Sequence, residues 1–265
     1  QRSTVNPPLS NVPSVLANLK SAIPSPIFAA PYTIIMEQIK VIAFDADDTL
    51  WINEPYFRET EMAFGQLMED FLPAHTVARE LLQTEVKNLT LYGYGIKGFT
   101  LSMIETALNV SNRTIDVKAI DKILDLGRAL LARPIELLEG VEDVLVALKQ
   151  HYRLVVATKG DLLDQERKLK NSGVEHHFHH IEIMSEKAAG DYQKLIKHLD
   201  IPPSQFLMIG NSLKSDVLPV LEIGGHAIHI PYHTTWAHEH VEHHIEHENF
   251  KAVTHIKEIL PLLLS

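Results

Sequence analysis

The sequence predicts an α/β protein: a Rossmann-like parallel sheet with helices on both faces, plus an inserted all-helical cap domain. Three observations predict this fold. Short apolar, β-branched segments recur along the chain, amphipathic helical patterns lie between them, and a long helical stretch separates the first two segments. Strands that alternate with helices pair as a parallel sheet through right-handed crossovers. The balance of 45% hydrophobic and 22% charged residues is typical of a globular protein.

Five of the apolar segments are expected to be buried strands. They span residues 40–44, 153–158, 181–184, 205–210 and 226–230, with helical patterns over 141–148, 162–169 and 192–199 between them. Three of the strands end at polar or small residues, namely Asp45, Thr158 and Gly210. Because active sites of parallel sheets lie at the carboxyl ends of strands, these positions indicate a candidate site.

The first two predicted strands are separated by far more chain than one crossover needs. Helices are expected there over residues 57–72, 76–91, 99–108 and 115–131. We therefore predict a helical cap domain of residues 53–138, inserted into a core domain of residues 36–52 and 139–265. Residues 1–35 are rich in proline and are interpreted as an extension outside the core.

Composition excludes several classes of function. The chain has no cysteine, which excludes disulfide scaffolds, cysteine nucleophiles and thiolate metal sites. Its formal net charge of −10 disfavours nucleic acid as a partner. No apolar run reaches the roughly 20 residues of a membrane helix. The apolar stretch of residues 15–30 is a poor signal peptide, because prolines interrupt it and few charged residues precede it. We expect a cytoplasmic protein without a membrane partner.

Four polar elements follow the predicted strands in order. Asp45 and Asp47 follow the first strand and Thr158 ends the second, whereas Lys187 and Asp216 follow the third and the fourth. Two carboxylates two residues apart can act separately, one as a nucleophile and one in proton transfer. Lysine and threonine supply positive charge and hydrogen bonds for phosphoryl oxygens, and carboxylates bind hard cations. The pattern favours phosphoryl chemistry.

This ordered set resembles the haloacid dehalogenase-like superfamily of hydrolases, from residue 39 to about residue 231. The resemblance implies that Asp45 is the nucleophile that forms an aspartyl-phosphate and that Asp47 is the general acid and base. It implies that Thr158 and Lys187 bind phosphate. It also implies a Mg²⁺ site formed by Asp45, Asp216 and the backbone carbonyl of Asp47. Finally, it implies a mobile helical cap after the first motif, where the long insertion lies.

Two positions depart from the family pattern. The motif after the fourth predicted strand often reads Gly-Asp-Ser in the family, whereas here it is Gly210-Asn211-Ser212. The neutral amide of Asn211, which we expect next to the metal, adds no charge to the cation site. The third motif commonly has a proline after the lysine, whereas Lys187 is followed by Ala188. Replacing that proline only makes the loop less stiff.

The segment with Gly93, Gly95 and Gly98 is not a dinucleotide fingerprint, because no strand precedes it. We interpret it as a flexible cap loop, in which Tyr94 and Lys97 face the substrate. The alternative is a plain connection between helices.

The histidine-rich tail has His240, His243, His244 and His247 at helical spacing. Because glutamates, including Glu239, are interleaved with them, we interpret this segment as a solvated helix face rather than a metal site.

The sequence thus predicts a Mg²⁺-dependent phosphohydrolase that acts on a small phosphorylated metabolite. Asp47 favours a phosphatase over a dehalogenase, because an ester needs its leaving oxygen protonated and a halide does not. A phosphosugar mutase that uses the same aspartyl-phosphate and a catalytically weak phospho-ligand binding protein remain as alternatives. Neither the substrate nor the oligomeric state follows from the sequence.

Overall fold

The computed structural model describes residues 38–239, 241 and 245–264. These residues form a parallel sheet of six strands in the order β3-β2-β1-β4-β5-β6. The strands are β1 (Val41–Phe44), β2 (Arg153–Lys159), β3 (His180–Met184), β4 (Phe206–Gly210), β5 (His226–His229) and β6 (Phe250–Ala252). The prediction of an α/β protein with a parallel sheet is confirmed, and β6 is a strand that the sequence did not predict. The predicted extension of residues 1–35 lies outside the described residues.

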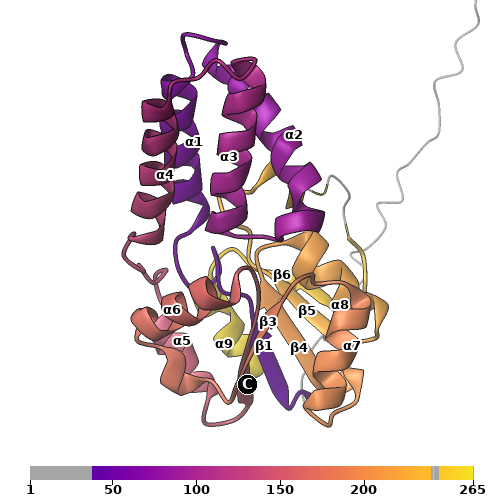
Figure 1. The fold of residues 1–265 in the computed structure, drawn as a ribbon. Coiled ribbons are helices and arrows are strands. Elements are labelled where there is room, and N and C mark those ends of the chain that lie inside the picture. Colours follow the sequence, from indigo (N-terminus) through magenta and orange to yellow (C-terminus); the bar gives the residue numbers. More distant parts are fainter. Residues whose placement is uncertain (1–37, 240, 242–244, 265) are drawn as a thin grey trace, which may run out of the picture. The chain divides into compact units, whose positions relative to one another are not determined.

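Alternating side chains of each strand bury the two faces of the sheet. In β1, Ile42 and Phe44 join one hydrophobic cluster, whereas Val41 and Ala43 join the other. Helices α5, α6 and α9 pack on the first face, and α7 and α8 pack on the second (Figure 1). These helices are α5 (Val141–Leu148), α6 (Leu162–Ser172), α7 (Ala189–His198), α8 (Leu218–Glu222) and α9 (Leu260–Leu263).

Between β1 and β2 the chain forms four helices with a hydrophobic core of their own (Figure 1). They are α1 (Glu54–Leu67), α2 (Ala74–Tyr92), α3 (Ile96–Val110) and α4 (Val117–Leu131). We call residues 53–138 the helical insertion. Its core includes Phe64, Met68, Leu81, Phe99, Met103 and Ile123.

The two segments that join the helical insertion to the sheet lie side by side. The Ile52 amide donates to the Glu136 carbonyl at 3.0 Å, and the Leu138 amide donates to the Leu50 carbonyl at 2.9 Å. Asp48 comes just before the first of these segments and has a backbone φ of +62°. Its carboxylate accepts hydrogen bonds from the backbone amides of Asn53 and Glu54 and so caps the start of α1. The boundaries of the inserted domain at residues 53 and 138 stay a prediction, and they fall at these paired segments.

In the described part of the chain, no helix is both long and apolar enough to cross a membrane.

Candidate active site

The order of the strands determines where a site can form. The chain winds outward from β1 to β3 and returns on the other side of β1 with β4, so the crevice at the carboxyl ends of β1 and β4 is the switch point of the sheet. A cavity of about 190 Å³ lies there. The predicted site residues that line it are Asp45, Asp47, Tyr94, Thr158, Lys187, Asn211 and Asp216. The fold therefore brings together seven of the eight residues predicted from the sequence.

A buried ammonium joins two carboxylates at the base of the cavity. Lys187 Nζ lies 2.5 Å from Asp45 Oδ1 and 2.7 Å from Asp216 Oδ1, and all three side chains are buried. Burial disfavours the charged ammonium, but Asp216 and Asp45 together raise the pKa of Lys187 above its ordinary value. Burial also raises the pKa of Asp45 to about 7, against the opposing effect of Lys187. One ammonium cannot neutralise two carboxylates, so this cluster holds an uncompensated negative charge when all three groups are ionised.

Asp216 reaches this cluster through two local features of the chain. It lies in a short π-helix, η5 (Leu213–Val217), where its Oδ2 accepts from the Ser212 amide at 2.9 Å. A Cβ on Gly210 would come within 2.2 Å of the same oxygen. The absence of a side chain at Gly210 therefore makes room for the Asp216 carboxylate.

The Asp47 carboxylate accepts hydrogen bonds from Trp51, four residues further along the chain, and from two residues of α6. Trp51 Nε1 donates to Oδ1 at 2.7 Å, Gln165 Nε2 donates to Oδ2 at 2.8 Å, and Lys168 Nζ lies 3.0 Å from Oδ1. The sequence did not single out Gln165 or Lys168. Both lie on the buried face of α6, whereas Leu163 on the same helix is 66% exposed. Because α6 turns polar side chains inward, a hydrophobic pattern could not identify this face.

The hydroxyl group of Thr49 lies between the side chains of Asn211 and Asp45. Thr49 Oγ1 lies 3.2 Å from Asp45 Oδ2 and 3.3 Å from Asn211 Oδ1, so it can donate to one or the other. The backbone carbonyl of Asn211 is 2.9 Å from His229 Nε2. The amide thus lies near the nucleophile candidate, and its predicted place next to the metal stays a prediction.

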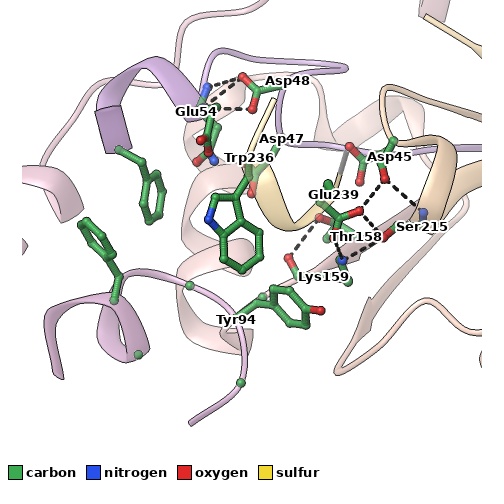
Figure 2. A pocket seen from close by; sticks show the side chains of 18 of the residues that line it. Asp45, Asp47, Asp48, Glu54, Tyr94, Thr158, Lys159, Ser215, Trp236 and Glu239 are labelled. Carbon is green, nitrogen blue, oxygen red and sulfur yellow. Dashed lines mark hydrogen bonds and ion pairs between the residues drawn. The ribbon is translucent and has the colours of Figure 1, made fainter. Parts of the chain in front are cut away.

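The C-terminal segment corrects one expectation. Glu239 was predicted on a solvated helix face, but its side chain is only 12% exposed and lines the cavity. It accepts from Lys159 at 2.6 Å, from Ser212 at 2.5 Å and from Ser215 at 2.6 Å (Figure 2). Lys159 holds the pKa of Glu239 at about 2 against the effect of burial.

The rest of the histidine-rich tail gives no helix that the structure can describe. His240, His243 and His244 lie outside the described residues, and His247 is not in a helix. Glu239 itself belongs to a single 3₁₀ turn, η6 (Ala237–Glu239). No signal in the sequence pointed to the return of this segment to the cavity, since it depends on where the chain goes after β5.

The two residues predicted from the cap loop differ in their placement. The Tyr94 ring lies 4.1 Å from Lys159 Nζ and 6.1 Å from the Trp236 ring, so Tyr94 faces the cavity (Figure 2). Lys97 does not line it: its ammonium pairs with Asp161 at 2.9 Å. The structure therefore gives Lys97 a partner in the sheet domain instead of the predicted place facing the substrate.

The glycines of this loop permit the close approach of the two regions. Gly95 has a φ of +108°, and a Cβ there would lie 3.2 Å from the backbone nitrogen of Asp161. A side chain at this position would meet both backbone strain and a neighbouring backbone atom.

The expected Mg²⁺ ligands form a small oxygen-rich set. In the described part of the chain no group of three or more His, Asp or Glu side chains could hold a metal ion. The expected set contains only two carboxylates, Asp45 and Asp216, and one backbone carbonyl, that of Asp47. Their hard oxygens and the uncompensated charge beside Lys187 fit a divalent cation.

Comparisons with known proteins agree with this arrangement. The model of the haloacid dehalogenase-like hydrolase family matches residues 39–224. A haloacid dehalogenase-like hydrolase from Xanthomonas campestris is 37% identical, with a TM-score of 0.76 over 86% of this chain and 93% of that chain. None of the curated proteins compared matches this chain.

More distant structures share the fold. The magnesium-bound protein YfnB of Bacillus subtilis is 17% identical, and a 2-haloacid dehalogenase of Pseudomonas syringae is 15% identical. Each has a TM-score of 0.57 over 85% of this chain and 98% of its own. The fold therefore does not decide between phosphate and halide chemistry. The extent of the family match and the identity to the Xanthomonas protein show that the chain belongs to the haloacid dehalogenase-like hydrolases.

Proposed function

We propose that this chain is a Mg²⁺-dependent phosphohydrolase that cleaves a small phosphorylated metabolite through an aspartyl-phosphate on Asp45. One observation carries the choice of a phosphate ester over a halide. A second carboxylate, Asp47, lines the same cavity and is held by Trp51, Gln165 and Lys168. An alkoxide leaving group needs a proton donor, and a halide does not.

The proposed reaction has two steps. An Asp45 oxygen attacks phosphorus while the bond between phosphorus and the leaving oxygen breaks, and protonated Asp47 gives its proton to that oxygen. Asp47 then takes a proton from water, whose oxygen attacks the same phosphorus. This second step releases inorganic phosphate and restores the Asp45 carboxylate.

The remaining site residues bind charge in this proposal. Lys187 and the hydroxyl of Thr158 interact with phosphoryl oxygens, and Lys187 also holds Asp45 and Asp216 in place. Asp45, Asp216 and the carbonyl of Asp47 would hold Mg²⁺, with Asn211 beside them. A bound Mg²⁺ supplies positive charge that stabilises the phosphoryl group.

The helical insertion acts as a cap in this proposal, because its residues line the cavity together with the motif residues. A cap that closes over bound substrate excludes bulk water from the reaction.

Phosphate release from an aryl phosphate, measured with Mg²⁺ and with a chelator, tests the proposal. We expect turnover that depends on Mg²⁺ and no halide release from a 2-haloacid. Halide release without phosphate release would contradict it. Binding of phosphate esters without turnover would also contradict the proposed hydrolase activity. Interconversion of sugar phosphates without net phosphate release would contradict it as well.

A further inference from the structure

The two ends of the cavity differ in whether cationic side chains line them. The cations that line it are Lys159, Lys168 and Lys187, all from the sheet domain. Among the described residues of the helical insertion that line it, none is lysine or arginine, whereas three are glutamates: Glu54, Glu61 and Glu85. A ligand that spans the cavity therefore meets both lysines and carboxylates at the motif loops, and carboxylates without a lining lysine or arginine at the far wall.

Glu85 is the glutamate of this wall that has no ion pair among the described residues, although the side chain of Trp236 forms a hydrogen bond with its carboxyl group. It is 8% exposed, and its Oε1 has no hydrogen-bond partner among the described residues. The nearby guanidinium of Arg58 is taken up by the other two carboxylates, at 3.1 Å from Glu54 and 2.8 Å from Glu61. A buried carboxylate oxygen without a partner is costly, so this position fits a donor that arrives with the ligand.

Asn88, one helical turn after Glu85 on α2, adds a second free acceptor. It is 2% exposed, and its Nδ2 donates to Ser102 Oγ at 3.2 Å and to Glu105 at 2.9 Å. These bonds fix the orientation of the amide and leave its Oδ1 without a partner among the described residues. Both free oxygens belong to residues that line the cavity, so a bound ligand can donate hydrogen bonds to them.

Aromatic rings complete this end of the cavity. The rings of Phe57 and Phe99 lie 5.1 Å apart, and the rings of Tyr94 and Trp236 lie 6.1 Å apart. All four residues line the cavity, and the indole of Trp236 lies between Glu54 and Tyr94 in Figure 2. Aromatic faces attract cations, and together with carboxylates they are a typical environment for an ammonium group.

We infer that the substrate is a phosphomonoester whose leaving group carries a protonated amine, and that Glu85 and Asn88 bind the N–H donors of that amine. This inference rests on the proposed phosphohydrolase activity, since the phosphate occupies the motif end of the cavity. Two free acceptors favour a primary or secondary amine over a quaternary ammonium, which has no N–H to donate. The small cavity indicates an aminoalkyl or amino-sugar phosphate.

The ionisation of the wall agrees with this ligand. Burial raises the pKa of Glu85 to about 8. The negative charges of Glu61 and Glu54 add to this rise, whereas a hydrogen bond with Trp236 and the positive charge of Arg58 oppose it. Near neutral pH the carboxyl group of Glu85 therefore binds a proton in the free protein. An ammonium beside it favours the carboxylate, so binding of the amine should release protons.

The first test compares ω-aminoalkyl phosphates of two to six carbons with n-alkyl phosphates of the same length. We expect the wild-type protein to prefer the amine at one chain length, by about tenfold or more in kcat/KM, the effect of one charge-assisted hydrogen bond. Glu85→Gln should abolish most of this preference, so that kcat/KM falls at least about fivefold more for the aminoalkyl phosphate than for the n-alkyl phosphate of the same length. The control is Glu80→Gln, on the same helix but outside the residues that line the cavity.

The outcomes separate this inference from the proposed function. If no phosphate ester is turned over, including the aryl phosphate, the phosphohydrolase proposal fails. If esters are turned over with equal kcat/KM for amino and plain chains, only the amine inference fails. A preference that survives in Glu85→Gln overturns the assignment to Glu85.

A measurement on the wild-type protein covers the case in which Glu85→Gln does not fold. Titration calorimetry with 3-aminopropyl phosphate, in the presence of a chelator that prevents turnover and in two buffers of different ionisation enthalpy, should show proton release near pH 7, and propyl phosphate should show less. Equal proton release for the two ligands would overturn the inference.

Discussion

The two walls of the cavity differ in how their charged groups are paired. On the sheet side Lys187 pairs with Asp45 and Asp216, and Lys168 pairs with Asp47. The amide oxygen of Gln165 has no partner among the described residues on this side. On the insertion side Glu85 and Asn88 each keep a buried oxygen without a partner in the described part of the chain. Preformed pairs hold catalytic groups in one geometry before substrate arrives. Free acceptors reward only a ligand that brings the missing donor, so the first wall serves the reaction and the second serves the choice of substrate.

Removing the nucleophile candidate should have the largest effect. Asp45→Asn keeps the shape of the side chain but replaces the attacking oxygen by a poor nucleophile and removes one charge beside Lys187. We expect the loss in kcat for an aryl phosphate to approach about 10⁶-fold, with an unchanged circular dichroism spectrum. The control is Asp125→Asn, an exposed carboxylate on α4. Activity above one tenth of wild type would exclude Asp45 from this role.

Asp47→Asn should have a smaller effect that depends on the leaving group. General acid catalysis contributes about 10²–10⁴-fold, and an alkyl phosphate needs the proton more than a nitrophenyl phosphate does. We expect the measured loss in kcat/KM to be at least about tenfold greater for the alkyl ester. Equal losses on both esters would show that Asp47 does not protonate the leaving oxygen.

The sheet side of this comparison was predictable from the sequence. Buried strands such as β1 and β4 are short apolar runs, and their carboxyl ends meet at one edge because the sheet is parallel. These two features are enough to predict that Asp45 and Asp216 lie close together. Asp47 was placed by its spacing, but its partner Lys168 was not, because α6 buries a polar face and exposes Leu163.

The insertion side was not predictable in the same way. Glu85 and Asn88 lie in a helix whose pattern indicates only an amphipathic element. That they line one cavity with Trp236 depends on packing between distant segments. Glu239 shows the same limit, because its pairing with Lys159 depends on the path of the chain after β5. Local periodicity reports which residues are buried, but not which buried polar groups face a cavity.

Asn211 allows the charge balance of the sheet side to be changed by one unit. Asn211→Asp adds a carboxylate beside Thr49 and Asp45. If the position borders the cation, the concentration of Mg²⁺ that gives half-maximal activity should fall several-fold, since added charge strengthens the binding of hard cations. The conservative variant Asn211→Gln, which adds no charge, serves as the control. An unchanged or increased Mg²⁺ requirement in Asn211→Asp would show that this side chain does not border the metal.

The smallest expected effect belongs to Lys97, whose ion pair with Asp161 links the two regions. Its side chain is 56% exposed, and exposed pairs of this kind typically contribute about 0–1 kcal/mol. Lys97→Ala should therefore lower kcat/KM by less than about fivefold, and by the same factor for an aminoalkyl phosphate and a small aryl phosphate. Asp161→Asn, which removes the other partner, should reproduce the effect, and the double variant should add little to either single change, because both remove one interaction. A loss confined to the longer substrate would instead restore the predicted contact between Lys97 and the substrate, and would place a cation on a wall that otherwise carries carboxylates.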